Sequence, residues 1–367
     1  MYDTKQVELE AAIADLYGRE HAVFVGRGTT GFALVFEALG IDGEVLFPAY
    51  TCPAPAYGAR YAGATPAFCD VSPQDYNATV ETFQERMTDE TSAVVPIHIF
   101  GHPFDVAAIQ DFCTNHNLYL IEDACQIVGG KIDGHTPGSV GVASVVSFGP
   151  NKPIDAGGGG AVLTDDESLA ADLRERAATL PLREEKHLKL LAELYRDTYY
   201  SIRDVMGVVP EATNLFQSFP KVFRDLYIMG YDDGSLPALE SAIARVDDVI
   251  DSRRRNASTY HSLLDHSDVT HPDPRGRPVP YRYSVRLPDR ETRDSVVATL
   301  READFHVSTL YDPPLHRHFA ADGSYPTAER LSDQTLNLWV TERVDVEYVE
   351  RCAKAVLEAI EDIERSS

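Results

Sequence analysis

The residue with the clearest chemical potential is Lys152, in the segment SVVSFGPNKPIDAGGGGAVLT. It lies between two apolar runs and shortly before four consecutive glycines, Gly157 to Gly160. Apolar strands of this kind leave little exposed surface, so Lys152 is not explained as a charge that only increases solubility. Burial and a nearby cation can lower the pKa of such a lysine and make it a nucleophile. We therefore predict a nucleophilic Lys152 with a lowered pKa. The alternative is that Lys152 binds a phosphate as a plain charge.

A glycine-rich turn, GRGTTG at Gly26 to Gly31, follows an apolar run and opens a helical pattern. It matches the dinucleotide fingerprint, but that motif needs an acidic residue about 20 positions on, and the strand EVLFP there ends in Pro48 instead. A helix N-terminus still presents free N–H groups to an anion, and Thr29 and Thr30 add hydroxyl donors. Phosphate is the predicted ligand, with Gly28 and Ser147 as further contacts. An unliganded tight turn and a turn-capping Ser147 are the alternatives.

The run LYLIEDACQ places Glu122 and Asp123 at the carboxyl end of a predicted strand, where open α/β sheets bind ligands. An aspartate there can keep the ring nitrogen of pyridoxal phosphate protonated, which maintains the electron sink of that cofactor. Gln126 is placed to reach the other side of the same ring. Alternatively, Asp123 caps a turn or helix.

The elements that must position these residues alternate along the first half of the chain. Short apolar runs separated by amphipathic segments predict an α/β fold with a mostly parallel sheet covered by helices on both faces. The predicted strands are 22–26, 44–48, 64–71, 92–101, 118–124, 144–149 and 160–164, and predicted helices include 31–40 and 105–117.

Longer helical patterns follow residue 165, including one long amphipathic run over 236–264. A turn-rich break at 272–280 precedes a compact α+β pattern. We therefore predict a large cofactor-binding domain over residues 1–240, a small C-terminal domain over 241–367, and an N-terminal helix that packs on the small domain.

Composition narrows the class of protein. The net charge of −25, from 58 acidic and 33 basic residues, disfavours nucleic acid and anionic membranes as partners. No apolar run is long enough to span a bilayer and no leader pattern is present, which favours the cytoplasm. The five cysteines are widely spaced, so neither a disulfide framework nor a metal site is predicted. With only seven lysines, the acidic chain also fits a halophilic source, for which unfolding at low ionic strength is expected. The alternative is an ordinary acidic cytoplasmic protein.

Together these motifs resemble the DegT/DnrJ/StrS family of sugar aminotransferases, which have the type I fold of pyridoxal-phosphate enzymes. GRGTTGFAL is similar to that family's S-G-T-x-A-L loop, IEDACQIVGG to its E-D-A-A-Q-A-x-G segment, and SFGPNK to its S-F-x-x-x-K. FPAYTCPAPAYG and YDPPLHRHF extend the likeness over nearly the whole chain.

The resemblance implies an aminotransferase that moves an amino group, usually from glutamate, to a keto sugar on a nucleotide carrier. It implies that Lys152 holds pyridoxal phosphate as a Schiff base and shuttles protons, and that Asp123 binds the pyridine nitrogen. Gln126 would lie near the ring hydroxyl. Gly28, Thr29, Thr30 and Ser147 would bind the phosphate. The family implies a homodimer with sites at the subunit interface.

Three positions depart from the family pattern. Cys52 stands where an aromatic residue stacks on the cofactor ring, Gly158 replaces a glutamate, and Asp232 replaces an asparagine that reaches the partner's cofactor phosphate. These departures leave two alternatives open: a pyridoxal-phosphate-dependent deoxysugar dehydratase and a non-catalytic regulatory relative. Family members of the dehydratase type tend to carry histidine in place of the lysine, so Lys152 favours amino transfer.

Overall fold

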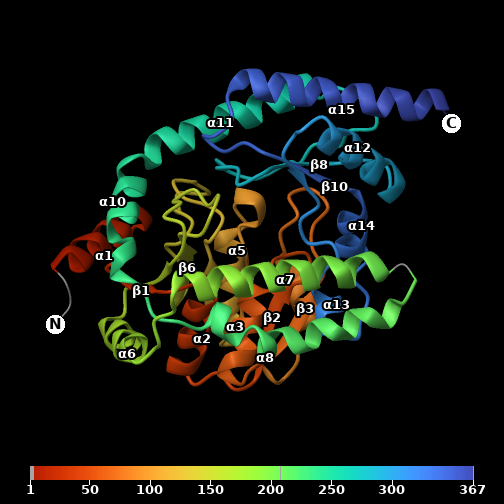
Figure 1. Cartoon of the computed structure of the whole chain (residues 1–367). Coiled ribbons are helices and arrows are strands. Elements are labelled where there is room, and N and C mark those ends of the chain that lie inside the picture. Colours follow the sequence, from red (N-terminus) through yellow and green to blue (C-terminus); the bar gives the residue numbers. More distant parts are fainter. Residues whose placement is uncertain (1–3, 207, 367) are drawn as a thin grey trace.

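The computed structural model describes residues 4–206 and 208–366, and its main feature is a seven-stranded sheet with the order β1-β7-β6-β5-β4-β2-β3 (Figure 1). Strands β2 to β6 run parallel, and β7 is antiparallel to both of its neighbours, so the sheet is mostly parallel, as predicted. The strands are β1 His21–Val25, β2 Glu44–Pro48, β3 Thr65–Cys69, β4 Thr91–Val94, β5 Tyr119–Asp123, β6 Ala143–Ser147 and β7 Gly160–Thr164.

Successive side chains of each strand point to opposite faces of this sheet, and a hydrophobic core lies on each face. This explains why the strands are continuous apolar runs in the sequence. In β1, Val23 and Val25 enter one core while Ala22 and Phe24 enter the other. The first core is covered by α2 Gly28–Ala38, α3 Ala54–Ala62 and α6 Glu167–Ala178. The opposite face is covered by α1 Thr4–Tyr17, α4 Val80–Arg86, α5 Val106–His116 and α10 Leu236–Ala244.

One predicted strand is too long. The run 92–101 was expected to be a single strand, but β4 ends at Val94. Pro96 has no N–H to continue the ladder, and the chain then turns through the short 3-10 helix η1 Ile99–Gly101, where Phe100 has φ 53°. The Pro96 carbonyl still accepts a hydrogen bond from Asp123 N at 3.0 Å, so the segment before this turn stays attached to the end of β5.

The second half of the chain differs more from expectation. The run 236–264 forms two helices, α10 and α11 Val246–Leu263, because Arg245 between them leaves helical geometry. The long helix α7 Glu185–Val205 was not predicted. It leads through η2 Pro210–Ser218, α8 Phe219–Val222, α9 Arg224–Tyr227 and η3 Asp233–Ser235 back to the large sheet.

A three-stranded sheet, β8-β10-β9, has its own hydrophobic core beneath α11 and α15 (Figure 1). The sheet and its covering helices comprise β8 Tyr283–Arg286, α12 Arg290–Glu302, β9 Val307–Ser308, β10 Thr335–Leu338 and α15 Val346–Ser366, whereas α13 Leu315–His318 and α14 Pro326–Gln334 pack on the core of the large sheet. Helix α1 packs into the core of the large sheet beside α10. The domain boundary near residue 240 stays a prediction.

Candidate active site

The predicted site residues meet at the edge of the large sheet where the parallel strands end. Asp123 is the last residue of β5 and Ser147 the last of β6, while Gly28 follows the end of β1. Lys152 follows β6 in the loop that leads to β7. Carboxyl ends of neighbouring parallel strands share one edge, which is where α/β sheets bind ligands.

The loop that carries Lys152 is fixed by its own hydrogen bonds. The Asp155 carboxylate accepts from Asn151 N at 2.8 Å and from Gly157 N at 3.0 Å, closing the loop on both sides of the lysine. Asn151 has φ 66°, a left-handed conformation that asparagine tolerates better than most residues. Lys152 N donates to Gly149 O at 3.1 Å. These bonds fix the backbone from which the lysine side chain projects.

Arg253 on α11 clamps this loop from the small-domain side. Its side chain is fully buried and donates to Asn151 O at 2.9 Å and to Lys152 O at 3.3 Å. The same guanidinium donates to the carbonyls of Pro280 and Tyr281, each at 3.3 Å. Burial lowers its pKa to about 10, so the group remains charged at neutral pH. Arg253 therefore links the lysine loop to the segment that carries Tyr281.

The amine of Lys152 lies 4.6 Å from the centroid of the Tyr281 ring, and Lys152 itself is half-buried. Burial lowers the pKa of this amine, but the acidic groups around it raise the pKa by more, so it stands above its ordinary value. In order of effect, these groups are Tyr281, Cys125, Cys52 and Asp123. The predicted lowering of the pKa is therefore wrong for the protein alone, because the neighbours are acids and not cations.

Asp123 is buried next to Lys152 and has few partners of its own. Its carboxylate accepts from Cys125 N at 2.9 Å, and the Cys125 thiol is a second hydrogen-bonding neighbour. Burial raises the pKa of Asp123, and the Cys125 N–H, the Cys125 thiol and the Lys152 charge oppose that rise only in part. A buried carboxylate with spare acceptor capacity suits a cationic N–H from a ligand.

The adjacent Glu122 is, by contrast, fully used by the protein. It accepts from His98 Nε2 at 2.6 Å, from Gly138 N at 2.7 Å and from Val140 N at 3.0 Å. Phe104 N donates to His98 Nδ1 at 3.3 Å, so the Nε2 atom carries the proton toward Glu122. Glu122 and His98 therefore hold loops together, and Asp123 alone faces the site.

Gly28 lies at the N-terminus of α2, where a phosphate cradle is predicted. The N–H groups of Gly28, Thr29 and Thr30 precede the first hydrogen bond of α2, from Gly31 N to Arg27 O at 3.1 Å. A Cβ placed on Gly28 would lie 3.3 Å from Cys125 Sγ and 3.8 Å from Ser147 Cβ. These groups therefore converge where an anion can meet the N-terminus of α2.

The predicted role of the Thr30 hydroxyl needs correction. Its single hydrogen goes to Tyr227 O at 2.6 Å, and its oxygen accepts from Met229 N at 3.3 Å. Only the backbone N–H of Thr30 is left for an anion. Thr29 is buried in the same turn.

Gln126 lies on the Asp123 side of the site and supports a neighbouring loop. Its side-chain oxygen accepts from Phe100 N at 3.0 Å, which fixes the η1 turn. The residue is almost fully buried. Its predicted contact with a cofactor ring remains untested by these bonds.

These residues fit pyridoxal phosphate. An amine, an underused buried carboxylate and a glycine cradle at a helix N-terminus match its aldehyde, ring nitrogen and phosphate. The three positions that depart from the family pattern can also be located. Cys52 is an electrostatic neighbour of Lys152, and a Cβ on Gly158 would meet nothing within 4 Å. Asp232 accepts a hydrogen bond from Gly234 N at 3.0 Å.

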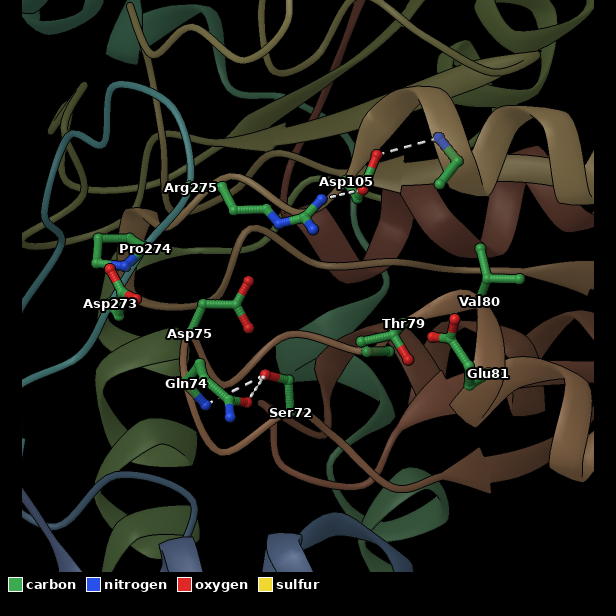
Figure 2. Close-up of a pocket in the computed structure, with 12 residues that line it drawn as sticks. Ser72, Gln74, Asp75, Thr79, Val80, Glu81, Asp105, Asp273, Pro274 and Arg275 are labelled. Carbon is green, nitrogen blue, oxygen red and sulfur yellow. Dashed lines mark hydrogen bonds and ion pairs between the residues drawn. The ribbon is translucent and has the colours of Figure 1, made fainter.

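Two other groups lie apart from this site. A cavity of about 430 Å³ is lined by Asp75, Glu81, Asp105 and Asp273, with Arg275 paired to Asp105 (Figure 2). It contains none of the predicted site residues, and its acidic walls do not suit a phosphate. In the small domain His266, Asp268 and Glu364 bring ligand-type atoms within 4.8 Å of one another.

Sequence reasoning missed Tyr281 and Arg253. Both come from outside the large sheet and reach the lysine only through tertiary packing. The run Arg253–Arg255 on an otherwise amphipathic helix was the one available signal, because a helix of 3.6 residues per turn must direct at least one of three successive arginines toward its buried face.

The model of the DegT/DnrJ/EryC1/StrS aminotransferase family matches residues 2–185 and 237–357. A pleiotropic regulatory protein of Geobacillus stearothermophilus is 29% identical over 350 residues, which cover 90% of this chain and 82% of the relative. GDP-perosamine synthase of Caulobacter vibrioides is 30% identical over 345 residues, covering 90% and 84%. The crystal structure of DesI in the presence of its TDP-sugar product superposes with a TM-score of 0.80 at 26% identity, covering 100% of this chain and 87% of that one.

Fold and site together define a pyridoxal-phosphate-dependent aminotransferase with an α/β, type I architecture. The chain belongs to the DegT/DnrJ/EryC1/StrS aminotransferase family, which confirms the resemblance seen in the sequence.

Proposed function

We propose that this enzyme transfers an amino group from glutamate to the keto group of a nucleotide-linked sugar. The observation that carries the proposal is the meeting of the Lys152 amine and the buried Asp123 carboxylate at the edge of the sheet beside a phosphate cradle. Relatives whose names refer to GDP- and TDP-sugars support the class of acceptor.

In this proposal Lys152 Nζ attaches the cofactor covalently and later moves a proton between the donor and acceptor carbons. Asp123 binds the pyridine nitrogen, and Gln126 lies by the ring hydroxyl. When bound, pyridoxal phosphate supplies the electron sink for the carbanion. The backbone N–H groups of Gly28, Thr29 and Thr30 and the hydroxyl of Ser147 bind the phosphate.

The enzyme is also proposed to act as a homodimer in the cytoplasm. Twelve large apolar residues are exposed in the described part of the chain, and seven of them lie between 182 and 209, on or next to α7. A concentration of exposed apolar surface of this kind fits a subunit interface. No helix within residues 4–206 and 208–366 is long and apolar enough to cross a membrane.

The test is an absorption spectrum of purified protein with added pyridoxal phosphate, before and after borohydride. Wild type and Lys131→Ala, which changes an exposed lysine, are expected to show a visible band that borohydride removes. Lys152→Ala is expected to lack that band and to consume no glutamate. A wild-type protein that shows no visible band after unbound cofactor has been removed by gel filtration contradicts the proposal.

The regulatory relative from Geobacillus stearothermophilus gives a second candidate some support, since a regulatory protein of this family need not transfer an amino group. The arrangement of Lys152 and Asp123 favours catalysis. A glutamate-dependent change of the cofactor band in wild type, lost in Lys152→Ala, separates the two candidates.

A further inference from the structure

Three cations surround one surface pocket that the proposed chemistry does not use. Arg60 at the end of α3, Lys221 on α8 and Arg224 at the start of α9 line a cavity of about 350 Å³, here called the basic pocket. Within residues 4–206 and 208–366, none of the three forms an ion pair with a carboxylate. In a chain with 58 acidic and 33 basic residues, such a group of unneutralised cations points to an anionic ligand.

The walls of the basic pocket are aromatic. The Arg60 guanidinium lies 5.4 Å from the centroid of the Phe319 ring, and the Arg224 guanidinium lies 5.3 Å from that of Tyr61. Stacking on a ring orients a guanidinium while leaving its N–H groups free for a phosphate. The Tyr61 hydroxyl oxygen is buried and has no hydrogen-bond partner among the described residues.

The floor of the basic pocket is rigid and uncharged. His318 stacks on Phe216 with 4.2 Å between ring centroids and 10° between ring planes. Burial lowers the pKa of His318 to about 3, so the imidazole is neutral at physiological pH. An aromatic floor beneath a cationic rim matches a planar ring that carries phosphate groups, and the volume is in the usual range for a small ligand.

Location ties the basic pocket to the active site. Tyr57 lines it, and Cys52 is an electrostatic neighbour of both Tyr57 and Lys152. The residues from Phe216 to Arg224 lie in the segment 186–236, outside the region matched by the family model. This part of the chain therefore adds a feature of its own beside the shared site.

We propose that the basic pocket binds a nucleoside diphosphate group. Its base lies against the rings of Tyr61, Phe216 and Phe319, and its phosphates accept hydrogen bonds from Arg60, Lys221 and Arg224. Binding of this group as the carrier of the amino acceptor rests on the proposed function. Binding of a free nucleotide does not.

The experiment measures binding of UDP, GDP and dTDP to the full-length holoenzyme by calorimetry at low, fixed ionic strength. The pocket variant is Lys221→Gln with Arg224→Gln. The control is Arg255→Gln with Arg301→Gln, which removes the same charge from exposed positions on α11 and α12. Loss of charge-assisted hydrogen bonds is expected to weaken binding by the pocket variant about tenfold or more, with the control unchanged. The proposal is overturned if wild type binds none of the three nucleotides, or if the two variants bind equally.

Two further readouts separate the possible results. Cofactor absorbance and glutamate-dependent spectral change are expected to stay intact in the pocket variant. If wild type shows neither spectral signal, the proposed function is contradicted and the nucleotide-binding proposal is not. If the spectra are intact but no nucleotide binds, only the nucleotide-binding proposal is contradicted. A raised KM for a nucleotide-linked keto sugar in the pocket variant identifies the acceptor's carrier as ligand, and an unchanged KM with weakened binding identifies a free nucleotide.

Discussion

The Lys152 site and the basic pocket are close in space but are built in different ways. The Lys152 site lies at a sheet edge, and buried partners such as Arg253 fix its loop through backbone carbonyls. The basic pocket presents exposed cations on short helices, held mainly against aromatic rings. The first arrangement supplies the fixed geometry that chemistry needs, and the second can bind a charged group without changing its reactivity. Substitutions in one region, and changes of salt concentration that act on it, should therefore leave the other region unchanged.

Among these changes, Asp123→Asn is expected to produce the largest difference between its effect on the Lys152 site and its effect on the basic pocket. Loss of the carboxylate that faces the cofactor should slow the glutamate-dependent change of the cofactor band by about 10²- to 10⁴-fold, in the range of a lost catalytic proton-transfer group. Nucleoside diphosphate binding should not change. The single-turnover rate of that spectral change and calorimetry on the same preparation check both parts.

The same variant carries a stability prediction. Because burial raises the pKa of Asp123 in the folded state, the ionised carboxylate costs stability at neutral pH. Asp123→Asn without cofactor is therefore expected to melt at the same or a higher temperature at pH 7, with the gain fading below about pH 4, near the ordinary aspartate pKa. Glu122→Gln is the matched control and should instead lose about 1 to 3 kcal/mol, since each carboxylate oxygen accepts from a backbone N–H and the new NH2 group must replace one of them. A lower melting temperature for Asp123→Asn at pH 7 contradicts this account.

Arg253→Met is expected to have the next largest effect, on the Lys152 site alone. It removes a buried charge that binds four carbonyls and lies 3.6 Å from Glu342, and should lower the free energy of unfolding by about 3 to 5 kcal/mol. Urea denaturation measures the loss. Arg254→Met, which loses bonds to Pro278 O and Gly129 O at a less buried position, should cost less, and an equal cost argues against a special role for Arg253.

Salt should distinguish the two regions next. Exposed cations are screened, so raising ionic strength from about 0.05 M to 0.5 M is expected to weaken nucleoside diphosphate binding several-fold. The visible cofactor band should keep its intensity over the same range, because the attachment is covalent and largely buried. Titration calorimetry and absorbance at matched salt concentrations test this, and equal salt dependence of both would remove the distinction.

The smallest effect is expected for Tyr281→Phe. The Tyr281 phenol is the strongest influence that raises the pKa of Lys152, so its removal should shift cofactor capture by the cofactor-free protein to lower pH. Only the unprotonated amine reacts, and its fraction grows about tenfold per pH unit below the pKa. The rate at which the visible band appears, measured across pH, reports the shift. Tyr119→Phe, at an exposed position, should leave the profile in place.

Much of the large domain was predictable because strand positions bury both faces. Runs such as EVLFP and GAVLT had the lengths of their strands, and placing Asp123 and Ser147 at strand ends was enough to bring them to one edge. The segment 92–101 was misjudged because its apolar content continues past Pro96, where the ladder cannot.

The remaining errors concern contacts between distant segments. The Thr30 hydroxyl is taken by Tyr227 and Met229, about 200 residues away in the chain. The pKa of Lys152 depends on Tyr281, Cys125 and Cys52, which come from three separate loops. Neither arrangement leaves a local pattern. Helix α7 was missed although its amphipathic face is pronounced, and most of its residues remain exposed in the single chain.

The central claim is that Lys152 alone holds the cofactor, and the chain makes a direct test possible because it has only seven lysines. Borohydride reduction of the pyridoxal phosphate complex, followed by proteolysis and mass spectrometry, locates the attachment. The account predicts one modified peptide, with the added mass on Lys152 at near-stoichiometric yield. Modification spread over exposed lysines such as Lys131 and Lys354, or none on Lys152, would contradict it.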